Sequence, residues 1–240
     1  MGEGENSALA LAVMQGSSGQ GEGTEVVMRV GLFGGSFNPI HLGHLRAAEE
    51  VREEMALDLV YFIPAAAQPL KATAELASAE HRLAMVRLAT KGNRYFMVSD
   101  AEIRRGGQSY TIDTVRTFLK TLRPPVTLSL IMGADAFAEF ETWKDYRELA
   151  GLCSIIVHSR DRDSGPPKVS LAALNRLGYT VQSDHYVNQS GQTLSFLPTT
   201  CLPISATAIR EKLRQGKSIR YLVPGDVYDY IARHGLYGFA

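Results

Sequence analysis

Residues 28–55 read MRVGLFGGSFNPIHLGHLRAAEEVREEM, and this stretch decides the fold. The apolar run at residues 28–33 predicts a buried strand, and the glycine pair at 34–35 predicts a tight turn. Within residues 45–55 apolar side chains recur every three or four positions, which predicts a helix with one buried face. A strand, a glycine turn and a helix therefore follow one another, as they do in α/β domains.

The rest of the chain repeats this alternation of strand-like runs and amphipathic helical stretches. Compact runs rich in β-branched or aromatic residues predict strands at 28–33, 59–63, 95–99, 126–132 and 154–158. Their continuous apolarity predicts burial on both faces of a sheet. We therefore expect an α/β, Rossmann-like, doubly wound and mostly parallel sheet, with helices on both faces and a small helical C-terminal end.

Two other parts of the pattern complete the expected architecture. Four apolar residues at helical spacing predict a second helix that faces the core: Ile112, Val115, Leu119 and Leu122. Residues 161–197 give weaker signals, with strands expected near Tyr179 and Phe196. Two short helices that stop at Gly216 and Gly235 are expected to close the chain.

Length and composition favour one domain and argue against several classes of partner. A chain of 240 residues can bury one substantial core, so residues 28–240 are predicted to form a single domain. Residues 1–27 are rich in Gly, Ser and Glu and are expected to be a flexible extension without a targeting signal. Lys plus Arg equals Asp plus Glu, 25 against 25, so no global field favours nucleic acid or an anionic membrane.

The two cysteines, Cys153 and Cys201, lie far apart in the sequence, and neither has a second cysteine nearby. Such spacing argues against a disulfide framework or a zinc knuckle. Both thiols are therefore expected to be buried packing groups in a protein of the reducing cytoplasm.

The segment that follows the first strand carries the chemistry. Glycines let the backbone approach a ligand, and a helix N-terminus offers free N–H groups to a phosphate. Neither the dinucleotide spacing G-x-G-x-x-G nor the Gly-Lys-Ser/Thr of a P-loop is present here. His41 and His44 are three residues apart, so both rings are expected on one face, where a protonated imidazole would bind a phosphate. The alternative is that either histidine only caps or packs the helix.

The letters GLFGGSFNPIHLGHL at residues 31–45 resemble the H-x-G-H nucleotidyltransferase superfamily, and in particular the opening of bacterial nicotinate mononucleotide adenylyltransferases. The resemblance spans residues 28–237 and implies a single nucleotidyltransferase domain. It implies that this segment binds ATP through Gly34, Gly35, Ser36, Phe37, His41 and His44.

A second stretch, ISATAIR at residues 204–210, is similar to the family element I-S-x-T-x-I-R. Ser205 and Thr207 place hydroxyls beside the free amides of a helix start, and Arg210 adds a guanidinium fork that binds two phosphate oxygens. A triphosphate tail fits this set, so the three residues are predicted to bind ATP. An ordinary N-cap with a solvated arginine is the alternative.

A third stretch, from residue 99 to residue 114, resembles the family segment that ends in S-Y-T-x-x-T. Ser109, Tyr110 and Thr111 lie at the predicted start of a helix, whose free amides could hold the carboxylate of nicotinate. The resemblance therefore implies that these residues bind nicotinate mononucleotide. The alternative is that Thr111 only caps the helix and Tyr110 only packs.

Two short elements follow the fourth predicted strand and resemble the family's G-x-D and F-x-x-W. Gly133 would allow close approach of ATP, and Asp135 would accept hydrogen bonds from its ribose or base. Trp143 offers a flat face for the pyridine ring of nicotinate mononucleotide, with a core position as the alternative.

The loop PAAAQPLK at residues 64–71 resembles the family's proline-rich loop with one departure. Leu70 stands where a histidine is usual, whereas Lys71 remains in register and is predicted to contact the mononucleotide phosphate. A solvated surface lysine is the alternative. The closing segment at residues 222–237 is also similar to the family and is expected to pack.

The resemblance implies direct in-line attack of nicotinate mononucleotide on the α-phosphorus of ATP, giving deamido-NAD and pyrophosphate. His41, His44 and Arg210 would stabilise the moving charge, and Mg²⁺ would enter with ATP without a dedicated carboxylate cage. Alternatives are another H-x-G-H enzyme, such as a nicotinamide mononucleotide or phosphopantetheine adenylyltransferase, and a non-catalytic nucleotide-sensing module. The sequence leaves open whether the chain forms a homo-oligomer.

Overall fold

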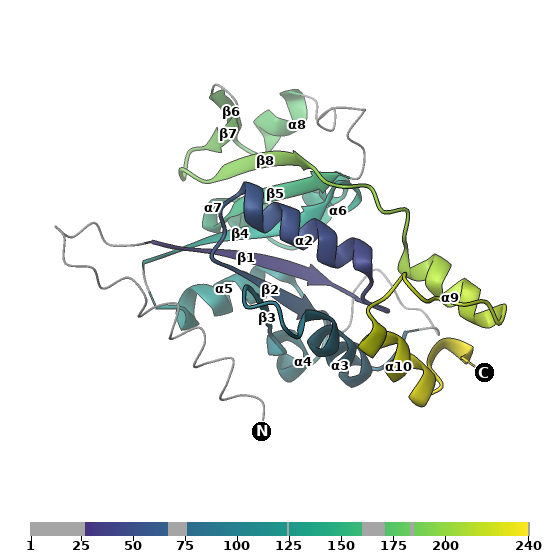
Figure 1. Cartoon of the computed structure of the whole chain (residues 1–240). Helices are drawn as coiled ribbons and strands as arrows, with labels where there is room; N and C mark the ends of the chain where they lie inside the picture. Colours follow the sequence, from purple (N-terminus) through teal and green to yellow (C-terminus); the bar gives the residue numbers. More distant parts are fainter. Residues whose placement is uncertain (1–26, 67–75, 124, 160–170, 183–184, 240) are drawn as a thin grey trace, which may run out of the picture.

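The computed structural model describes residues 27–66, 76–123, 125–159, 171–182 and 185–239. Within these residues eight strands form one sheet in the order β3-β2-β1-β4-β5-β8-β7-β6 (Figure 1). The strands are β1 (Met28–Gly35), β2 (Leu59–Pro64), β3 (Phe96–Val98), β4 (Val126–Gly133), β5 (Ser154–Ser159), β6 (Tyr179–Gln182), β7 (His185–Asn188) and β8 (Thr193–Pro198). The run from β3 to β8 is parallel, whereas β6 and β7 are antiparallel additions, so the expected mostly parallel sheet is confirmed.

The order of the strands fixes where a ligand can bind. From β1 the chain winds outward through β2 to β3, and it then crosses back to place β4 on the other side of β1. The segments that leave β1 and β4 therefore diverge, and ligands of such sheets bind in the crevice beyond the carboxyl ends of the strands at this point. The glycine and histidine segment leaves the sheet at this position.

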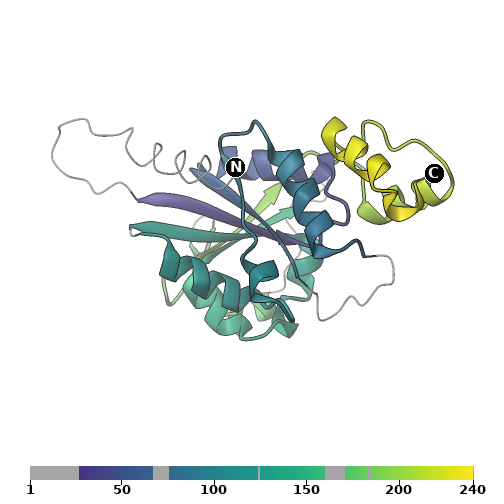
Figure 2. The same cartoon turned by 90° about the horizontal axis from the view of Figure 1, so that it is seen from below.

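Helices cover both faces of the sheet (Figure 2). One face packs against α2 (Leu42–Glu54), α3 (Ala79–Thr90), α9 (Ala206–Arg214), α10 (Gly225–Arg233) and the 3-10 turn η2 (Leu236–Gly238). The other face packs against α5 (Thr111–Thr121), α6 (Ala134–Ala138), the 3-10 turn η1 (Phe140–Thr142), α7 (Tyr146–Leu152) and α8 (Leu171–Arg176). The short helix α4 (Ala101–Arg105) precedes α5.

Alternation along β1 explains why the sheet needs helices on both sides. Val30 and Leu32 belong to the apolar cluster on the α5 face, and Phe33 belongs to the cluster on the α2 face. Phe62 of β2 is fully buried on the α2 face and packs against Phe33 with ring centroids 5.5 Å apart. Each strand thus contributes to two cores, as the continuous apolar runs predicted.

Two details of the predicted pattern are wrong. The glycine pair Gly34 and Gly35 does not turn, because both residues extend β1 and pair in register with Ile63 and Pro64 of β2. The chain turns only afterwards, at Phe37, whose φ is 45°.

The helical stripe on α5 is also wrong at one position. Leu119 is 37% exposed, and its neighbour Phe118 takes the buried place at 6% exposure. Both apolar side chains fit the helical period approximately, and packing against Tyr61 of β2, with ring centroids 5.0 Å apart, favours Phe118. Ile112 and Val115 are buried as predicted.

The weakly signalled region contains strands at both predicted places, β6 at Tyr179 and β8 at Phe196. The strand β7 between them was not predicted, because its four residues are all only half-buried and show no alternation. Cys153 is buried as expected, but Cys201 is exposed, since it follows the end of β8 in a segment without regular structure.

The chain ends in the predicted small helical region, α9 and α10 followed by η2. Gly216 and Gly235 follow the two helices in the left-handed region, with φ of 65° and 57°, which is the conformation in which glycine ends a helix. Residues 1–26 lie outside the described part, so the flexible extension and the single domain stay predictions. No helix among the described residues is long and apolar enough to cross a membrane.

Candidate active site

The predicted ATP residues gather beyond the carboxyl ends of β1 and β4. Figure 1 shows α9 and α10 beyond the arrowheads of β1 and β2, so the C-terminal helices and the segment after β1 meet at one end of the sheet. This is the edge at which a doubly wound sheet binds its ligands.

The two histidines lie against each other at the start of α2. His41 is the N-cap residue and His44 lies in the first turn, and their rings stack with centroids 3.7 Å apart. His41 is 1% exposed, whereas His44 is half-buried. A Cβ on the intervening Gly43 would lie 3.1 Å from Nδ1 of His41, so the glycine of H-x-G-H leaves room for the buried ring. The expected pairing of both imidazoles is confirmed.

The hydrogen bonding of His44 sets which nitrogen faces a ligand. The backbone N–H of His41 donates to Nδ1 of His44 over 3.2 Å, which requires a lone pair on that atom. A ring that accepts this bond on Nδ1 carries its proton on Nε2, whereas a ring protonated on both nitrogens could not accept it. The charge of His44 during the reaction stays a prediction.

Gly34, Gly35 and Phe37 have different structural roles in the segment at the end of β1. A Cβ on Gly34 would meet no atom within 4 Å, so this exposed position leaves its face open to a ligand. A Cβ on Gly35 would instead lie 3.1 Å from the ring of Phe37, which is only 2% exposed. The Phe37 ring packs edge-on against His44 with centroids 5.2 Å apart. Phe37 therefore supports the histidine by packing, and the predicted contacts of Ser36 and Phe37 with ATP stay predictions.

The helix α9 brings the predicted arginine to this segment from far along the chain. Arg210 donates from Nη1 to the backbone carbonyl of Asn38 over 2.8 Å, across 172 residues of sequence. Its Nη2 approaches Oγ1 of Thr207 at 3.4 Å, so the guanidinium and this hydroxyl lie together. Ser205 is the N-cap of α9, and its hydroxyl accepts from Ala208 N–H over 3.1 Å. The cap expected as the alternative for Ser205 is thus present in the structure.

The end of β4 contributes Gly133 and Asp135. Asp135 lies exposed in the first turn of α6, and its Oδ1 would be only 2.6 Å from a Cβ at Gly133. His158, at the end of the neighbouring strand β5, is 8% exposed and packs edge-on against Phe33 with centroids 5.8 Å apart. Its Nε2 would lie 3.8 Å from the same Cβ. A side chain at position 133 would therefore displace the Asp135 carboxylate from its present place.

We expect Gly133→Ala to disturb ATP binding without unfolding the protein. The φ of Gly133 is −74°, which alanine adopts without strain, but the new Cβ must push the Asp135 carboxylate away. The KM for ATP should rise about fivefold to tenfold, as measured in steady-state assays. Gly225→Ala is the matched control, because a Cβ at Gly225 meets nothing within 4 Å. Equal KM values in both variants would contradict this role.

The predicted acceptor residues lie next to the end of β2. Ser109 accepts from the backbone N–H of Ala66 over 3.0 Å, and Ala65 N–H donates to Gly35 over 2.9 Å. The acceptor segment and the ATP segment are therefore linked through the residues that follow β2. Thr111 is the first residue of α5, after Tyr110 at the N-cap, so the free amides of this helix start lie at the segment.

Tyr110 and Trp143 are both partly buried against the α5-face core. The Trp143 ring packs against Phe140 with centroids 5.6 Å apart, and the next residue, Lys144, places its Nζ 4.6 Å from the centre of the Tyr110 ring. Trp143 and the start of α5 thus lie close together. Leu70 and Lys71 fall outside the described residues, so their predicted contacts stay predictions.

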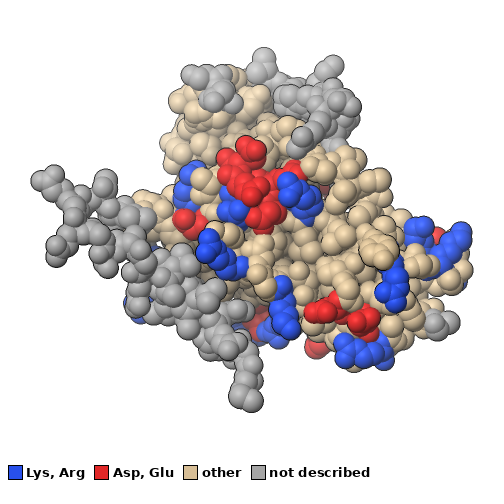
Figure 3. Space-filling model, viewed as in Figure 1, with Lys and Arg blue, Asp and Glu red and all other residues tan. Residues whose placement is uncertain are grey.

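Charge is distributed unevenly despite the balanced composition. The carboxyl half of α2 carries Glu49, Glu50, Glu53 and Glu54, of which Glu50 is buried, and Figure 3 shows a patch of acidic side chains over this helix. Lys and Arg side chains gather over α9, beyond the ends of the strands.

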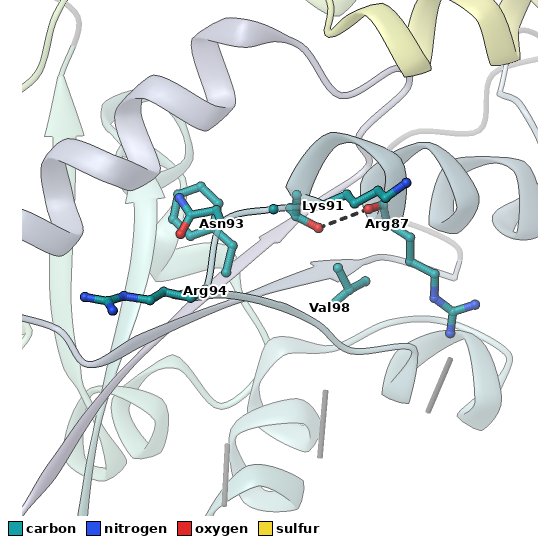
Figure 4. Close-up of a pocket in the computed structure, with 8 residues that line it drawn as sticks. Arg87, Lys91, Asn93, Arg94 and Val98 are labelled. Carbon is teal, nitrogen blue, oxygen red and sulfur yellow. Dashed lines mark hydrogen bonds between the residues drawn. The ribbon is translucent and has the colours of Figure 1, made fainter. Parts of the chain in front are cut away.

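Two hollows lie away from these residues. One of about 310 Å³ lies beside β3 and is shown in Figure 4; it is lined by Arg87, Thr90, Lys91, Gly92, Asn93, Arg94, Phe96 and Val98. The side chains of Arg87 and Arg94 extend in opposite directions there, so they do not converge on one anion (Figure 4). The other, of about 510 Å³, lies between α2 and α3. Neither hollow is lined by a residue predicted to bind ATP or the acceptor. The candidate site is therefore identified by the chemistry of its side chains and not by the position of a hollow.

Metal ligands do not cluster in the described part of the chain. Among these residues no three His, Cys, Asp or Glu side chains are grouped as a metal site would need. Of the candidate residues named above, Asp135 is the one that carries a carboxylate.

Sequence reasoning missed four residues at the strand ends: Asn38, Arg82, His158 and Tyr237. Tyr237 donates its hydroxyl to Oδ1 of Asn38 over 2.8 Å. Burial raises the pKa of Tyr237, although Arg210 and Arg82 nearby oppose the shift. The position of His158 directly at a strand end was the one signal that could have indicated a site residue.

A doubly wound sheet with stacked H-x-G-H imidazoles and an arginine at its switch point defines a nucleotidyltransferase. The family model described as cytidylyltransferase-like matches residues 32–212. Curated relatives include probable nicotinate-nucleotide adenylyltransferases of Geotalea daltonii, 41% identical over 88% of this chain and 98% of that protein, and of Pseudomonas fluorescens, 44% identical over 87% and 97%. The chain therefore belongs to the nicotinate-nucleotide adenylyltransferases of the cytidylyltransferase-like family.

Solved structures show the same fold at low sequence identity. The nicotinic acid mononucleotide adenylyltransferase of Plasmodium falciparum, complexed with NaAD, matches with a TM-score of 0.68 at 18% identity, over 89% of this chain and 98% of that one. A putative nicotinate-nucleotide adenylyltransferase from Vibrio parahaemolyticus matches with a TM-score of 0.56 at 18% identity, over the same shares. Enzymes of this family generally use a divalent metal ion together with ATP.

Proposed function

We propose that this chain transfers the adenylyl group of ATP to nicotinate mononucleotide, giving deamido-NAD and pyrophosphate. The observation that carries the proposal is the stacked pair His41 and His44 beside Arg210, at the point where the segments leaving β1 and β4 diverge. The names of the curated relatives support the choice of acceptor.

In the proposed reaction a phosphate oxygen of the mononucleotide attacks the α-phosphorus of ATP. The new P–O bond forms as the bond from the α-phosphorus to the bridging oxygen of the β-phosphate breaks, and pyrophosphate leaves with that electron pair. No side chain forms a covalent bond. His44 donates from Nε2 to a phosphate oxygen, Arg210 holds the leaving phosphates, and both stabilise charge that grows during the transfer.

The acceptor half of the site is proposed to use Ser109, Thr111 and Trp143. The start of α5 has free backbone amides and a positive dipole end, which suit the carboxylate that distinguishes nicotinate from nicotinamide. Trp143 is half-exposed near this helix start and offers a face to the pyridine ring. Lys71 stays the proposed contact of the mononucleotide phosphate.

We propose Mg²⁺ as the metal and the cytoplasm as the compartment. One exposed carboxylate, Asp135, fits a metal that keeps waters and is bound largely by ATP oxygens. When bound, Mg²⁺ would neutralise part of the charge on the phosphates. The free thiols Cys153 and Cys201 fit a reducing compartment.

A substrate panel tests the proposal. The full chain, incubated with ATP and Mg²⁺, should release pyrophosphate with nicotinate mononucleotide and should form deamido-NAD, identified by mass spectrometry. We expect the kcat/KM for nicotinamide mononucleotide to be at least about tenfold lower, because the helix amides lose their anionic partner.

Three other outcomes of the substrate panel would contradict the proposed function. Faster turnover with phosphopantetheine would overturn the substrate assignment, and pyrophosphate release with none of the acceptors would overturn the enzymatic function. ATP binding without any turnover would indicate a nucleotide-sensing module instead.

A further inference from the structure

Arg82, on α3, is a charged side chain buried at the centre of the strand ends. It is 1% exposed, and its guanidinium donates three hydrogen bonds to backbone carbonyls. Nε donates to Ala77 over 3.0 Å, Nη1 to Ser36 over 2.8 Å, and Nη2 to Ala66 over 3.1 Å. None of the chemistry assigned above uses this residue.

The three carbonyls belong to different segments of the chain. Ser36 lies in the ATP segment after β1, and Ala66 lies in the segment after β2. Ala77 directly precedes the N-cap of α3. Because the N–H of Ala66 donates to Ser109, one peptide segment is held by Arg82 and by the acceptor residue together. Arg82 therefore connects the ATP half of the site with the acceptor half.

Burying the guanidinium cation of Arg82 costs free energy, because the charge loses its hydration. The contacts that offset this cost therefore indicate why an arginine occupies this position. Backbone carbonyls carry no net charge, so they compensate only in part for the lost hydration of a guanidinium. Burial accordingly lowers the pKa of Arg82, opposed by electrostatic interactions with Tyr237, Glu80 and Glu102. An apolar side chain could fill the same space without this cost, but it could not join three segments.

Asn38 forms a second link that leaves the ATP segment supported without Arg82. Its Oδ1 accepts from the N–H of Ala77 over 3.1 Å and from the hydroxyl of Tyr237 over 2.8 Å. Its backbone carbonyl accepts from Arg210. The ATP segment is thus fixed by Asn38, by the pairing of β1 and by α2, whereas Ala66 depends on Arg82 and Ser109.

We propose that Arg82 is a positioning residue that aligns the acceptor half of the site with the ATP half, by holding the carbonyls of Ser36 and Ala66 on one guanidinium. This inference rests on the proposed adenylyl transfer to nicotinate mononucleotide. Arg82 touches neither substrate, so its loss should affect how the acceptor is aligned more than how tightly ATP binds.

Steady-state kinetics and ATP binding test the proposal together. In Arg82→Met the KM for nicotinate mononucleotide should rise about tenfold or more and kcat should fall, whereas the Kd for ATP alone, measured by calorimetry, should stay within about twofold. Arg82→Lys keeps the charge but cannot reach three carbonyls, so it should resemble Arg82→Met. Arg87→Met, an exposed arginine on the same helix, is the matched control and should match the wild type.

A double-mutant cycle tests whether the effect passes through Ala66. Ser109→Ala and Arg82→Met both release this residue, so their effects on the acceptor KM should be clearly less than additive. Full additivity would overturn the link. A folded Arg82→Met protein with unchanged acceptor KM would overturn the proposal, as would equal weakening of ATP and acceptor. Normal kinetics in Arg82→Lys would show that the charge suffices and would also overturn it.

Amide hydrogen exchange separates this inference from the proposed function, because it needs no activity. In Arg82→Met the amide of Ala66 should exchange at least about tenfold faster than in the wild type, while the amide of Ala77, which Asn38 holds, and the amides of β1 stay protected. Unchanged exchange would overturn the inference even in an active enzyme. If neither Arg82→Met nor Arg82→Lys folds, Arg82 is needed for folding itself and the positioning role is wrong. A wild-type protein that turns over no acceptor would instead reject the proposed function.

Discussion

His44→Ala is expected to lower kcat by about 10²–10³-fold, the largest single effect in the molecule, because it removes the donor that faces the transferring phosphate. With Nδ1 accepting the backbone N–H of His41, the ring directs its Nε2 away from the helix start, and we propose that this nitrogen is the donor. Rapid-quench measurement of dinucleotide formation, with both substrates saturating, reports this loss directly.

A second variant separates catalysis from helix capping at this residue. In His44→Asn the side-chain oxygen can accept the N–H of His41, as Nδ1 does, but the amide does not reach the ligand. We expect it to keep the melting temperature of the wild type and to be almost as slow as His44→Ala. A wild-type rate in His44→Asn would show that the residue only caps the helix. His234→Ala, at an exposed histidine, is the control and should be fully active.

Arg210→Met should lower kcat/KM for ATP by about 10²-fold, the second largest effect. The guanidinium donates to the carbonyl of Asn38, with Thr207 beside it, so these contacts fix its orientation next to the segment proposed to bind ATP. Arg210→Lys should recover only part of the loss, because a lysine keeps the charge but not the fork. Initial rates measured at varied ATP concentration give kcat/KM for ATP in the wild type and in each variant.

The matched control for this residue is Arg214→Met on the same helix. The Arg214 side chain is 45% exposed and pairs with Glu211, so its loss removes a similar charge at one turn's distance from Arg210. We expect less than a twofold change in kcat/KM for this control. Equal losses in the two variants would mean that α9 contributes only a general positive potential.

Local sequence predicts the local parts of this structure well. The order of β1, the histidine segment and α2 follows from residues that are neighbours in sequence, and so does the closeness of His41 and His44. The glycine pair misled the interpretation because glycine also occurs where a strand must leave space. Here Gly35 leaves that space for the ring of Phe37, which is visible only in the packed structure.

Contacts between distant residues could not be predicted in this way. The hydrogen bond of Arg210 to Asn38 spans 172 residues, and only the family resemblance placed the two segments together. Arg82 was missed because an arginine in a helical pattern is usually solvated, and its burial depends on three carbonyls from separate loops. Whether Leu119 or Phe118 takes the buried position on α5 depends on packing against Tyr61 of β2, which the local sequence does not show.

The sheet places most of the predicted ATP residues and the predicted acceptor residues on different faces, although Gly133 and Asp135 lie at α6 on the acceptor face. Phe37 and Ile204, beside the ATP residues, belong to the core on the α2 face, whereas Tyr110 and Trp143 pack on the α5 face. Mutations that adapt the enzyme to a new acceptor can therefore accumulate around α5 and Trp143 while the histidine segment and Arg210 stay intact on the other face. A fold with this separation suits directed evolution toward unnatural dinucleotides, with diversity confined to the start of α5 and the segment around Trp143.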